Sequence, residues 1–384
     1  MTSDGCNAGP FKNMTRLPVV FDLLRLSGNG LRNAQIFNRI ISGKVNKPIC
    51  VLILGNGFSQ GFGFPSSTEL WDCCLQASSK IQGKARYFEF DYANRYPLSY
   101  FQEKQIKDIE LLLSIWHGCI VARKQFLDVN DVNSEEFGQK HYEVYIQNLC
   151  GHLLEYGDKA MEDKNGKISE FQQWLLKQLS SFEIRFVTLN YDLLLERIIT
   201  NIGKQFFYFG EPVNDNHVVL RKPHGSANWL KTNNHPLQRE DGWRPPLIWQ
   251  ENGEYVYNIN DDYSNVPYIG FKPLPVLIPP VVNKEYSSLF QAVLKSADND
   301  LHKATSVIIV GYSFPESDIV IRRVIEENSS RGSNFVYINS NANHCDEAKK
   351  LLGDKLSVIN KAWDIEILNK VFGHHRSKYE KQCT

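Results

Sequence analysis

Glycines that directly follow an apolar run give the first indication of chemistry in this chain. Residues 50–54 are Cys, Val, Leu, Ile and Leu, and they lead straight into the segment Gly55–Gly61, G-N-G-F-S-Q-G. A short run of this kind is typical of a buried parallel strand. Glycines at its end let the backbone approach a pyrophosphate and present N–H donors, although a plain tight turn uses the same residues. A dinucleotide site is the first hypothesis.

The spacing of these glycines argues against an ordinary NAD-dependent dehydrogenase. That class carries G-x-G-x-x-G and an acidic residue about twenty residues further on, at the end of a second strand. Here Gln60 stands at the third glycine position, and Asp72 falls within a predicted helix. Taken alone, the glycine-rich segment is therefore weak evidence for a nucleotide.

Two further segments place polar side chains at the ends of predicted strands. Asn190 and Asp192 follow the apolar run 184–188 and open a predicted helix. They should project from the carboxyl edge of the sheet, where open α/β sheets bind ligands, although either could instead cap the helix. His224 lies in the turn 222–226 after a short predicted strand. A lone histidine in a turn is often structural, but it titrates near neutrality, as a general base requires.

The remaining strand ends are also polar. The segment Gly311–Asp318, G-Y-S-F-P-E-S-D, follows another apolar run, and Asn339 follows the next. Ser317 or Asp318 could cap a helix, and Asn339 could form a turn. Four strand ends with small or polar residues are nevertheless a pattern that turn chemistry alone would rarely produce.

Apolar periodicity indicates the elements that must position these residues. Alternating strands and helices predict an α/β fold with a mostly parallel, Rossmann-like sheet, covered by helices on both faces. Ser66 and Glu69 have the spacing of a capping box. Apolar spacings of three and four predict a helical insertion at about residues 82–182, and residues 231–270, rich in Asn, Asp, Pro and Gly, predict a long loop or small excursion. Strands are expected at 50–54, 184–188, 206–209, 276–278, 307–310 and 335–338, and helices at 193–199, 289–303 and 318–328.

Composition narrows the class of protein. The chain has 384 residues and equal numbers of basic and acidic residues, 43 of each, so no global field attracts nucleic acid. Met1–Leu17 has no apolar signal-peptide core, and no apolar stretch is long enough to span a membrane, which predicts a cytosolic protein. The eight cysteines form no C-x-x-C pair and no zinc-like spacing with histidine. Reduced thiols and no structural metal are expected.

Together, the motifs resemble those of the sirtuin family in order and strand context across roughly residues 50–340. The family's T-Q-N-I-D resembles Thr188 to Asp192, which includes Tyr191, and its catalytic H-G resembles His224-Gly225. Its G-T-S resembles Gly311-Tyr312-Ser313, and its I-N resembles Ile338-Asn339. The family's first motif, G-A-G-I-S-x-x-x-G-I-P, is similar to this sequence at Gly55, Gly57, Phe58, Ser59, Gly63, Phe64 and Pro65.

This resemblance implies a domain organisation and a way of binding NAD+. A sirtuin-like NAD-binding domain with the helical insertion would span residues 49–343, between an N-terminal segment, 1–48, and a C-terminal segment, 344–384. The pyrophosphate of NAD+ would lie on N–H groups near Asn56 to Ser59. The ribose of its adenosine would lie near Ser313 and Asn339.

Two departures from the family pattern bear on the reaction. Ser66-Ser67-Thr68 stands where deacylating sirtuins carry D-F-R, and positions 225–310 contain no cysteine, so their four-cysteine zinc module is not encoded. The S-F-P-E-S-D, N-Y-D and H-G-S-x-N-W forms look more like the sirtuin-like NAD-hydrolysing subunits of bacterial antiphage defence systems. These implications favour an NAD+ hydrolase that releases nicotinamide and ADP-ribose and so depletes NAD+.

The resemblance also implies catalytic roles. Asn190 would orient the ribose hydroxyls and the attacking water, Asp192 would hold the nicotinamide carboxamide, and His224 would accept a proton from a hydroxyl or from water. Three alternatives stay open: an NAD-dependent protein deacylase, a non-catalytic NAD or ADP-ribose sensor, and an assembly module. The presence of both Asn190 and His224 favours catalysis.

Control is expected to come from other chains, because neither terminal segment is large enough to be a confident sensor domain. A stand-alone chain of this size is similar to the sirtuin-like partner of HerA-type ATPases. Such a partner would engage DNA itself, so this chain would need no direct contact with nucleic acid. The insertion's aromatic residues offer a surface for self-association or the insertion's own core, which suggests a homo-oligomer. These residues are Trp116, Tyr142, Tyr145 and Trp174.

Overall fold

The computed structural model describes most of the chain's second compact unit, Pro48–Thr384. The predictions for residues 1–46, for most of the insertion and for Trp116, Tyr142 and Tyr145 lie outside the described residues. The described residues are 47–66, 69–70, 146, 149–212, 214–233, 246–251, 254–258, 274–277, 288–331, 333–353 and 356–383.

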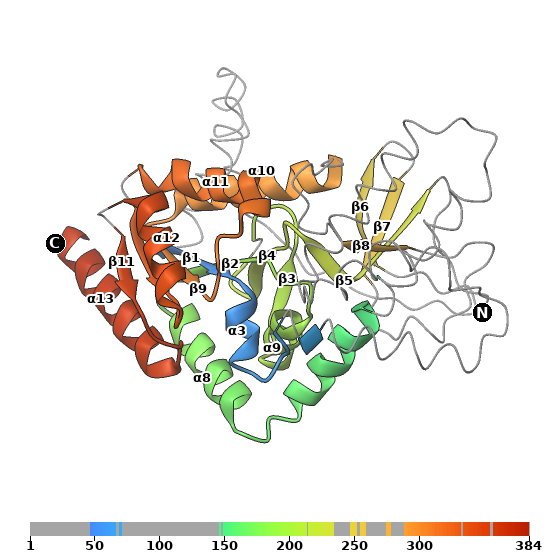
Figure 1. The fold of residues 1–384 in the computed structure, drawn as a ribbon, viewed down its shortest axis with the longest axis horizontal. Helices are drawn as coiled ribbons and strands as arrows, with labels where there is room; N and C mark the ends of the chain where they lie inside the picture. Colours follow the sequence, from blue (N-terminus) through green and yellow to red (C-terminus); the bar gives the residue numbers. More distant parts are fainter. Residues whose placement is uncertain are drawn as a thin grey trace, which may run out of the picture. The chain divides into compact units, whose positions relative to one another are not determined.

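Seven parallel strands form the central sheet, in the order β11-β10-β9-β1-β2-β4-β3 (Figure 1). After β1 the chain extends the sheet on one side through β2, β3 and β4, and later on the other side through β9, β10 and β11. The order reverses between β1 and β9, which is the kind of switch point where open α/β sheets bind ligands. The predicted α/β class with a mostly parallel sheet is confirmed. The strands are β1 Ile49–Leu54, β2 Glu183–Thr188, β3 Gln205–Phe207, β4 His217–Arg221, β9 Ser306–Val310, β10 Asn334–Ile338 and β11 Ser357–Ile359.

Helices cover both faces of this sheet (Figure 1). Cys50, Leu52 and Leu54 of β1 pack in one core with α8, α9 and α13, whereas Val51 and Ile53 pack in a second core with α11 and α12. Helix α10 contributes to both cores. Because β1 is buried on both faces, its sequence is apolar throughout rather than alternating. The helices are α3 Asn56–Gln60, α8 Lys167–Leu179, α9 Leu194–Asn201, α10 Ser288–Lys303, the 3-10 turn η1 Glu316–Asp318, α11 Ile319–Ser329, α12 Ala342–Leu352 and α13 Ile365–Cys383.

The predicted helices at 193–199, 289–303 and 318–328 are confirmed as α9, α10 and α11. The capping box is also present. The backbone N–H of Ser66 donates to Glu69 Oε2 over 2.7 Å, and the N–H of Glu69 donates to Ser66 Oγ over 3.2 Å. The hydrogen bonds that the Ser66 N–H and the Ser66 hydroxyl donate to the Glu69 carboxylate lower the pKa of that side chain.

The described end of the predicted insertion is helical, at residues 149–161 and in α8. Trp174 of α8 is buried, and its ring stacks on Phe171 and meets Phe372 of α13 edge to face. Of the two interpretations offered for this tryptophan, the structure supports the core one. The boundary expected at residue 344 falls inside α12, and both β11 and α13 continue the fold beyond it.

An antiparallel sheet in the order β6-β7-β5-β8 begins at the turn that follows β4. Of the long loop and the small excursion considered for residues 231–270, β6 and β7 support the excursion, and their aromatic and β-branched residues suit strands. The dipeptide Asn252-Gly253 between them is a strong hairpin signal that the Asn- and Pro-rich surroundings obscured. The strand expected at 276–278 belongs to this sheet rather than to the parallel one. The strands are β5 Gly225–Asn233, β6 Leu247–Glu251, β7 Glu254–Asn258 and β8 Leu274–Leu277.

Candidate functional site

The loops after β1 and β9 meet at the switch point through their backbones. The Gly57 N–H donates to the Gly311 carbonyl over 3.0 Å, and Gly55 N–H donates to Val310 over 3.0 Å. A Cβ on Gly55 would lie 2.6 Å from the Gly311 oxygen, and one on Gly57 would lie 2.9 Å from the Gly311 Cα. Gly311 itself has a φ of 64°. These glycines are therefore required by the close contact of two loops, whatever ligand binds there.

This contact changes the expected phosphate cradle. The Gly57 N–H is bonded to Gly311, and the Phe58 N–H is bonded to the Gly55 carbonyl over 2.9 Å. At least two of the four donors expected at Asn56 to Ser59 thus have intramolecular partners, and Ser59 lies where α3 first bonds its own backbone. The Phe58 side chain is core rather than ligand-facing, and Asn56 is exposed.

The loop after β2 is joined to α3 by a buried chain of hydrogen bonds. Asn190 Nδ2 donates to the Gly55 carbonyl over 3.0 Å and to Ser59 Oγ over 2.8 Å. Ser59 Oγ in turn donates to Asp192 Oδ2 over 2.8 Å. All three side chains are at least nine-tenths buried. The structure thus brings together two predicted catalytic residues and one predicted cofactor-binding residue.

Asp192 is also held from its other side. Its Oδ1 accepts the N–H of Leu194 over 3.0 Å at the start of α9, so the helix-capping role considered for this residue is present. Lys222 donates to the Asp192 backbone carbonyl, and it pairs with Glu196 over 2.8 Å while fully buried. Lys222 was not among the predicted site residues. Its place two residues before His224, at the end of a buried strand, was the available signal.

His224 lies between two acceptors at the end of β4. Its Nδ1 is 3.1 Å from the carbonyl oxygen of Leu189, and its Nε2 is 3.0 Å from Asp318 Oδ1. The Tyr191 ring centroid is 6.1 Å from that of the His224 ring. The next residue, Gly225, has a φ of 86°, and a Cβ there would collide with the Val276 carbonyl of β8. His224 is therefore fixed where the central sheet passes into the antiparallel one.

Asp318 is a site residue that the sequence presented only as a possible helix cap. It is 1% exposed and lies in η1, far from His224 along the chain. Tyr312 OH donates to its Oδ2 over 3.0 Å, so one predicted cofactor-binding residue reaches the His224 pair through Asp318. The sequence signal for this site residue was the aspartate that ends the segment S-F-P-E-S-D.

Ser313 and Asn339 lie at the neighbouring ends of β9 and β10. Ser313 is exposed, and Asn339 Nδ2 donates to the Tyr312 carbonyl over 3.3 Å and to Tyr337 OH over 3.0 Å. Asn339 Oδ1 accepts the N–H of Asn341 over 2.9 Å, which is the turn considered for it. Burial raises the pKa of Tyr337, so its hydroxyl stays a neutral donor. Tyr312 thus connects this end of the site to Asp318. Pro65 is buried next to the capping box.

Trp363, from the segment after β11, closes the outer side of the glycine-rich loop. Its indole N–H lies 3.2 Å from the carbonyl oxygens of both Gly57 and Phe58. Its ring stacks on Phe58 with centroids 4.8 Å apart, and a Cβ on Gly61 would lie 2.7 Å from it. Nothing in the local sequence paired residue 363 with this loop.

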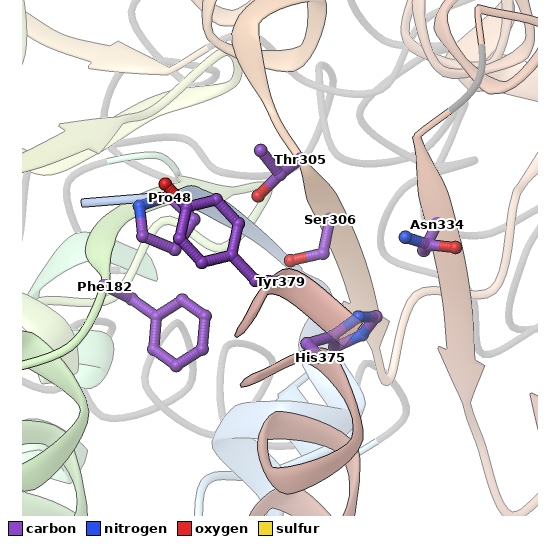
Figure 2. Close-up of a pocket in the computed structure, with 7 residues that line it drawn as sticks. All are labelled: Pro48, Phe182, Thr305, Ser306, Asn334, His375 and Tyr379. Carbon is purple, nitrogen blue, oxygen red and sulfur yellow. The ribbon is translucent and has the colours of Figure 1, made fainter. Parts of the chain in front are cut away.

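A cavity of about 30 Å³ lies at the other edge of the sheet (Figure 2). It opens at the amino ends of β1, β9 and β10, and it has room for about one water molecule. This cavity is therefore not a nucleotide site. Its lining residues are Pro48, Phe182, Thr305, Ser306, Asn334, His375 and Tyr379.

The described residues form neither a metal-binding cluster nor a membrane-spanning helix. No three His, Cys, Asp or Glu side chains in this part of the chain gather closely enough to hold a metal ion. None of its helices combines the length and the apolar character needed to cross a membrane.

One part of the chain is similar to a known protein family. Residues 184–359 match the model of the SIR2-like domain, so the match runs from β2 to β11 and includes Asn190, His224 and Asp318. The glycine-rich segment after β1 lies outside the matched range. A search of curated protein sequences gave no match. The chain thus has a parallel, Rossmann-like sheet, and its residues 184–359 are similar to the SIR2-like domain.

Solved sirtuin structures also match, at low similarity. One, from work on sirtuin substrate affinity, has 13% identity over 94% of this chain and 99% of that chain, with a TM-score of 0.32. Sir2Tm bound to a propionylated peptide has 12% identity over 88% and 98%, with a TM-score of 0.29. A SIR2 complex with an inhibitor, 2'-O-acetyl-ADP-ribose and a deacetylated peptide has 12% identity over 89% and 98%, with a TM-score of 0.32. TM-scores this low carry no argument about the fold. The fold class therefore rests on the sheet topology, and the family similarity rests on the match over residues 184–359.

Proposed function

We propose that the chain is an NAD+ hydrolase that cleaves the bond between nicotinamide and ribose, giving nicotinamide and ADP-ribose. The main support is the convergence of Ser59, Asn190, Asp192 and His224 on the carboxyl ends of β1, β2 and β4. A SIR2-like domain match over residues 184–359 supports NAD+ as the substrate.

The chemistry suits this set of side chains. Nicotinamide leaves from NAD+ as a neutral molecule, so the site must chiefly stabilise a cationic, oxocarbenium-like ribose and position water. In the proposal the Asp192 carboxylate, polarised by Ser59, supplies negative charge beside the ribose and contacts the carboxamide. The Asn190 amide orients the ribose hydroxyls and the water, and His224 is the proton acceptor.

The adenosine half of NAD+ is proposed to lie across the switch point, from the glycine-rich loop to Ser313 and Asn339. Because Gly57 N–H is bonded to Gly311, binding of the pyrophosphate there would have to replace that hydrogen bond. The two loops would then separate slightly as the nucleotide enters. The N–H of Asn56, at the start of α3, would supply a backbone donor.

Protein deacylation is the competing reaction within the same family resemblance. The zinc module expected of deacylating sirtuins would lie between His224 and Gly311, but positions 225–310 contain no cysteine. The described parts of that stretch form the β5–β8 sheet and α10 instead. We therefore favour water over an acyl-lysine peptide as the second substrate.

One assay separates the alternatives. The purified full chain is incubated with NAD+, with and without an acetyl-lysine peptide, and nicotinamide, ADP-ribose and 2'-O-acetyl-ADP-ribose are quantified. We expect nicotinamide and ADP-ribose in equal amounts, independent of peptide. Peptide-dependent formation of the acetylated product would identify a deacylase. NAD+ binding without turnover would identify a sensor.

We further propose that the chain works in the cytoplasm as a homo-oligomer controlled by a HerA-type ATPase in antiphage defence, since an uncontrolled NAD+ hydrolase would exhaust its own cell. Support comes from the sequence motifs and from the lack of net charge, which leaves DNA contact to the partner. Native mass and NAD+ turnover should be measured with and without the partner. A monomer that hydrolyses NAD+ at full rate alone would rule this proposal out.

A further inference from the structure

The His224 ring meets a hydrogen-bond acceptor at each of its two nitrogens. The Leu189 carbonyl oxygen, 3.1 Å from Nδ1, can only accept a hydrogen bond. The Asp318 carboxylate, 3.0 Å from Nε2, also accepts when it is ionised. A neutral imidazole carries one N–H and would leave one of these contacts between two acceptors. An imidazolium donates to both.

We propose that Asp318 is a positioning residue for His224, and that in the resting site it holds the ring as an imidazolium, donating from Nε2 to Asp318 and from Nδ1 to Leu189. The pair is buried, with His224 5% and Asp318 1% exposed. Two opposite charges at this distance compensate each other, whereas either one alone would be costly at such burial.

The loop that carries Asp318 is built to hold it in place. Tyr312 OH donates to Asp318 Oδ2, which leaves Oδ1 directed at His224. Phe314 has a φ of 53°, a strained value for a residue other than glycine. Arg322 of α11 donates to the Phe314 carbonyl over 3.2 Å and pairs with Glu347 of α12 over 2.8 Å. Strain of this kind persists only where surrounding contacts fix the backbone, and here those contacts fix the approach to Asp318.

The other ionisable groups around the ring have contacts of their own. Asp192 accepts from Ser59 and Leu194, and Lys222 pairs with Glu196. Tyr312 donates to Asp318, and the Tyr191 ring lies beside the His224 ring. Asp318 is the carboxylate that pairs with His224 at hydrogen-bond distance.

A charged His224 ring would affect the pH dependence of NAD+ hydrolysis. This kinetic part of the test rests on the proposed function. An imidazolium cannot accept a proton, so His224 becomes a base only after Nε2 has released its proton to solvent and parted from Asp318. The acidic limb of the pH–rate profile should report that step. Replacing Asp318 by a neutral residue should move this limb to lower pH, because the charged ring then loses its counterion.

The first measurement does not involve NAD+. In the full chain labelled with 15N-histidine, ring nitrogen shifts are followed with pH, and the His224 signals are identified by their loss in His224→Gln. We expect wild-type His224 at neutral pH to show the doubly protonated ring and Asp318→Asn to show a neutral one. Glu316→Gln, which neutralises an exposed carboxylate in the same turn, should leave the ring unchanged. A neutral ring in the wild type would overturn the proposal even if Asp318→Asn failed to fold.

The second measurement is the pH profile of NAD+ hydrolysis at matched folded fraction. For Asp318→Asn we expect an acidic limb at lower pH, so that below the wild-type limb the variant is faster by about tenfold per pH unit of displacement. Asp318→Glu keeps the charge and should keep the limb, even if its rate falls. Coincident limbs in wild type and Asp318→Asn would refute the role of the charge. If the wild type does not hydrolyse NAD+, the proposed function fails, while the ring spectra still decide the state of His224.

Discussion

At the scale of single residues, the centre of the candidate site is a relay from amide to hydroxyl to carboxylate. Asn190 donates to Ser59, and Ser59 donates to Asp192, with both distances 2.8 Å. Each donor polarises the next group, so the carboxylate is stabilised and its lone pairs are aimed. A change at any member should disturb the other two.

We expect Asn190→Ala and His224→Ala each to lower NAD+ hydrolysis by about 100-fold or more, the scale for losing an orienting group or a positioned base. Turnover should be measured at matched folded fraction. Asn328→Ala is the matched control, because Asn328 is also buried and donates to Asp298 and Val324 on another part of the fold. That variant should lose stability and keep its rate. Wild-type turnover by His224→Ala would count against the assignment of the site.

The sequence indicated the residues at strand ends better than their partners. Asn190, Asp192 and His224 could be selected because a parallel sheet brings the carboxyl ends of its strands to one edge. The contacts of Asp318 and Trp363 could not, because each joins segments that are far apart in the chain and whose side-chain directions depend on loops. Helix capping and a ligand site also draw on the same residue types, and Asp192 has a capping contact within the site.

At the scale of elements, the contact between the loops after β1 and β9 determines the shape of the switch point. Gly311→Ala should destabilise the fold by roughly 2 kcal/mol or more, since it adds a Cβ 2.6 Å from Gly57 Cα to a backbone with positive φ. Gly203→Ala is the control. Gly203 has a φ of 72°, but a Cβ there meets nothing within 4 Å, so it isolates the backbone strain. Equal losses in urea denaturation would mean that the loop contact contributes nothing.

The antiparallel sheet supports a prediction about metal. Because β5–β8 and α10 occupy a stretch without cysteine, we expect no stoichiometric zinc and no useful turnover of acyl-lysine peptides. Elemental analysis of the purified chain and thermal melts with and without EDTA measure this directly. About one zinc per chain, or a lower Tm in EDTA, would contradict it. The sheet itself was missed because its strands lie among Asn and Pro residues and carry little periodicity, whereas β1 and β9 are apolar runs that end at a glycine.

At the scale of the whole molecule, the C-terminal segment reaches the carboxyl edge of the central sheet, where the candidate site lies. Trp363 joins the segment after β11 to the glycine-rich loop, and α13 packs with α8 in the same core. Trp363→Ala should cost about 3 kcal/mol of unfolding free energy and weaken NAD+ binding, because the ring that supports Phe58 is lost. Trp363→Phe keeps an aromatic ring and loses the indole N–H, so it should retain more stability. Equal NAD+ affinity in the wild type and both variants would show that Trp363 does not contribute to NAD+ binding.

The position of β1 has a consequence for the synthesis of the chain. Cys50 pairs with Ile184 on one side and with Ser306 on the other, so this central strand leaves the ribosome before either of its neighbours exists. At about 5–20 residues per second, the wait for β9 is on the order of ten seconds or longer. During that time a flat, uncharged run with two open edges is exposed to other nascent chains. The chain should therefore depend on chaperones in the cell and refold slowly from denaturant, with β1 among the last strands to gain protection from hydrogen exchange.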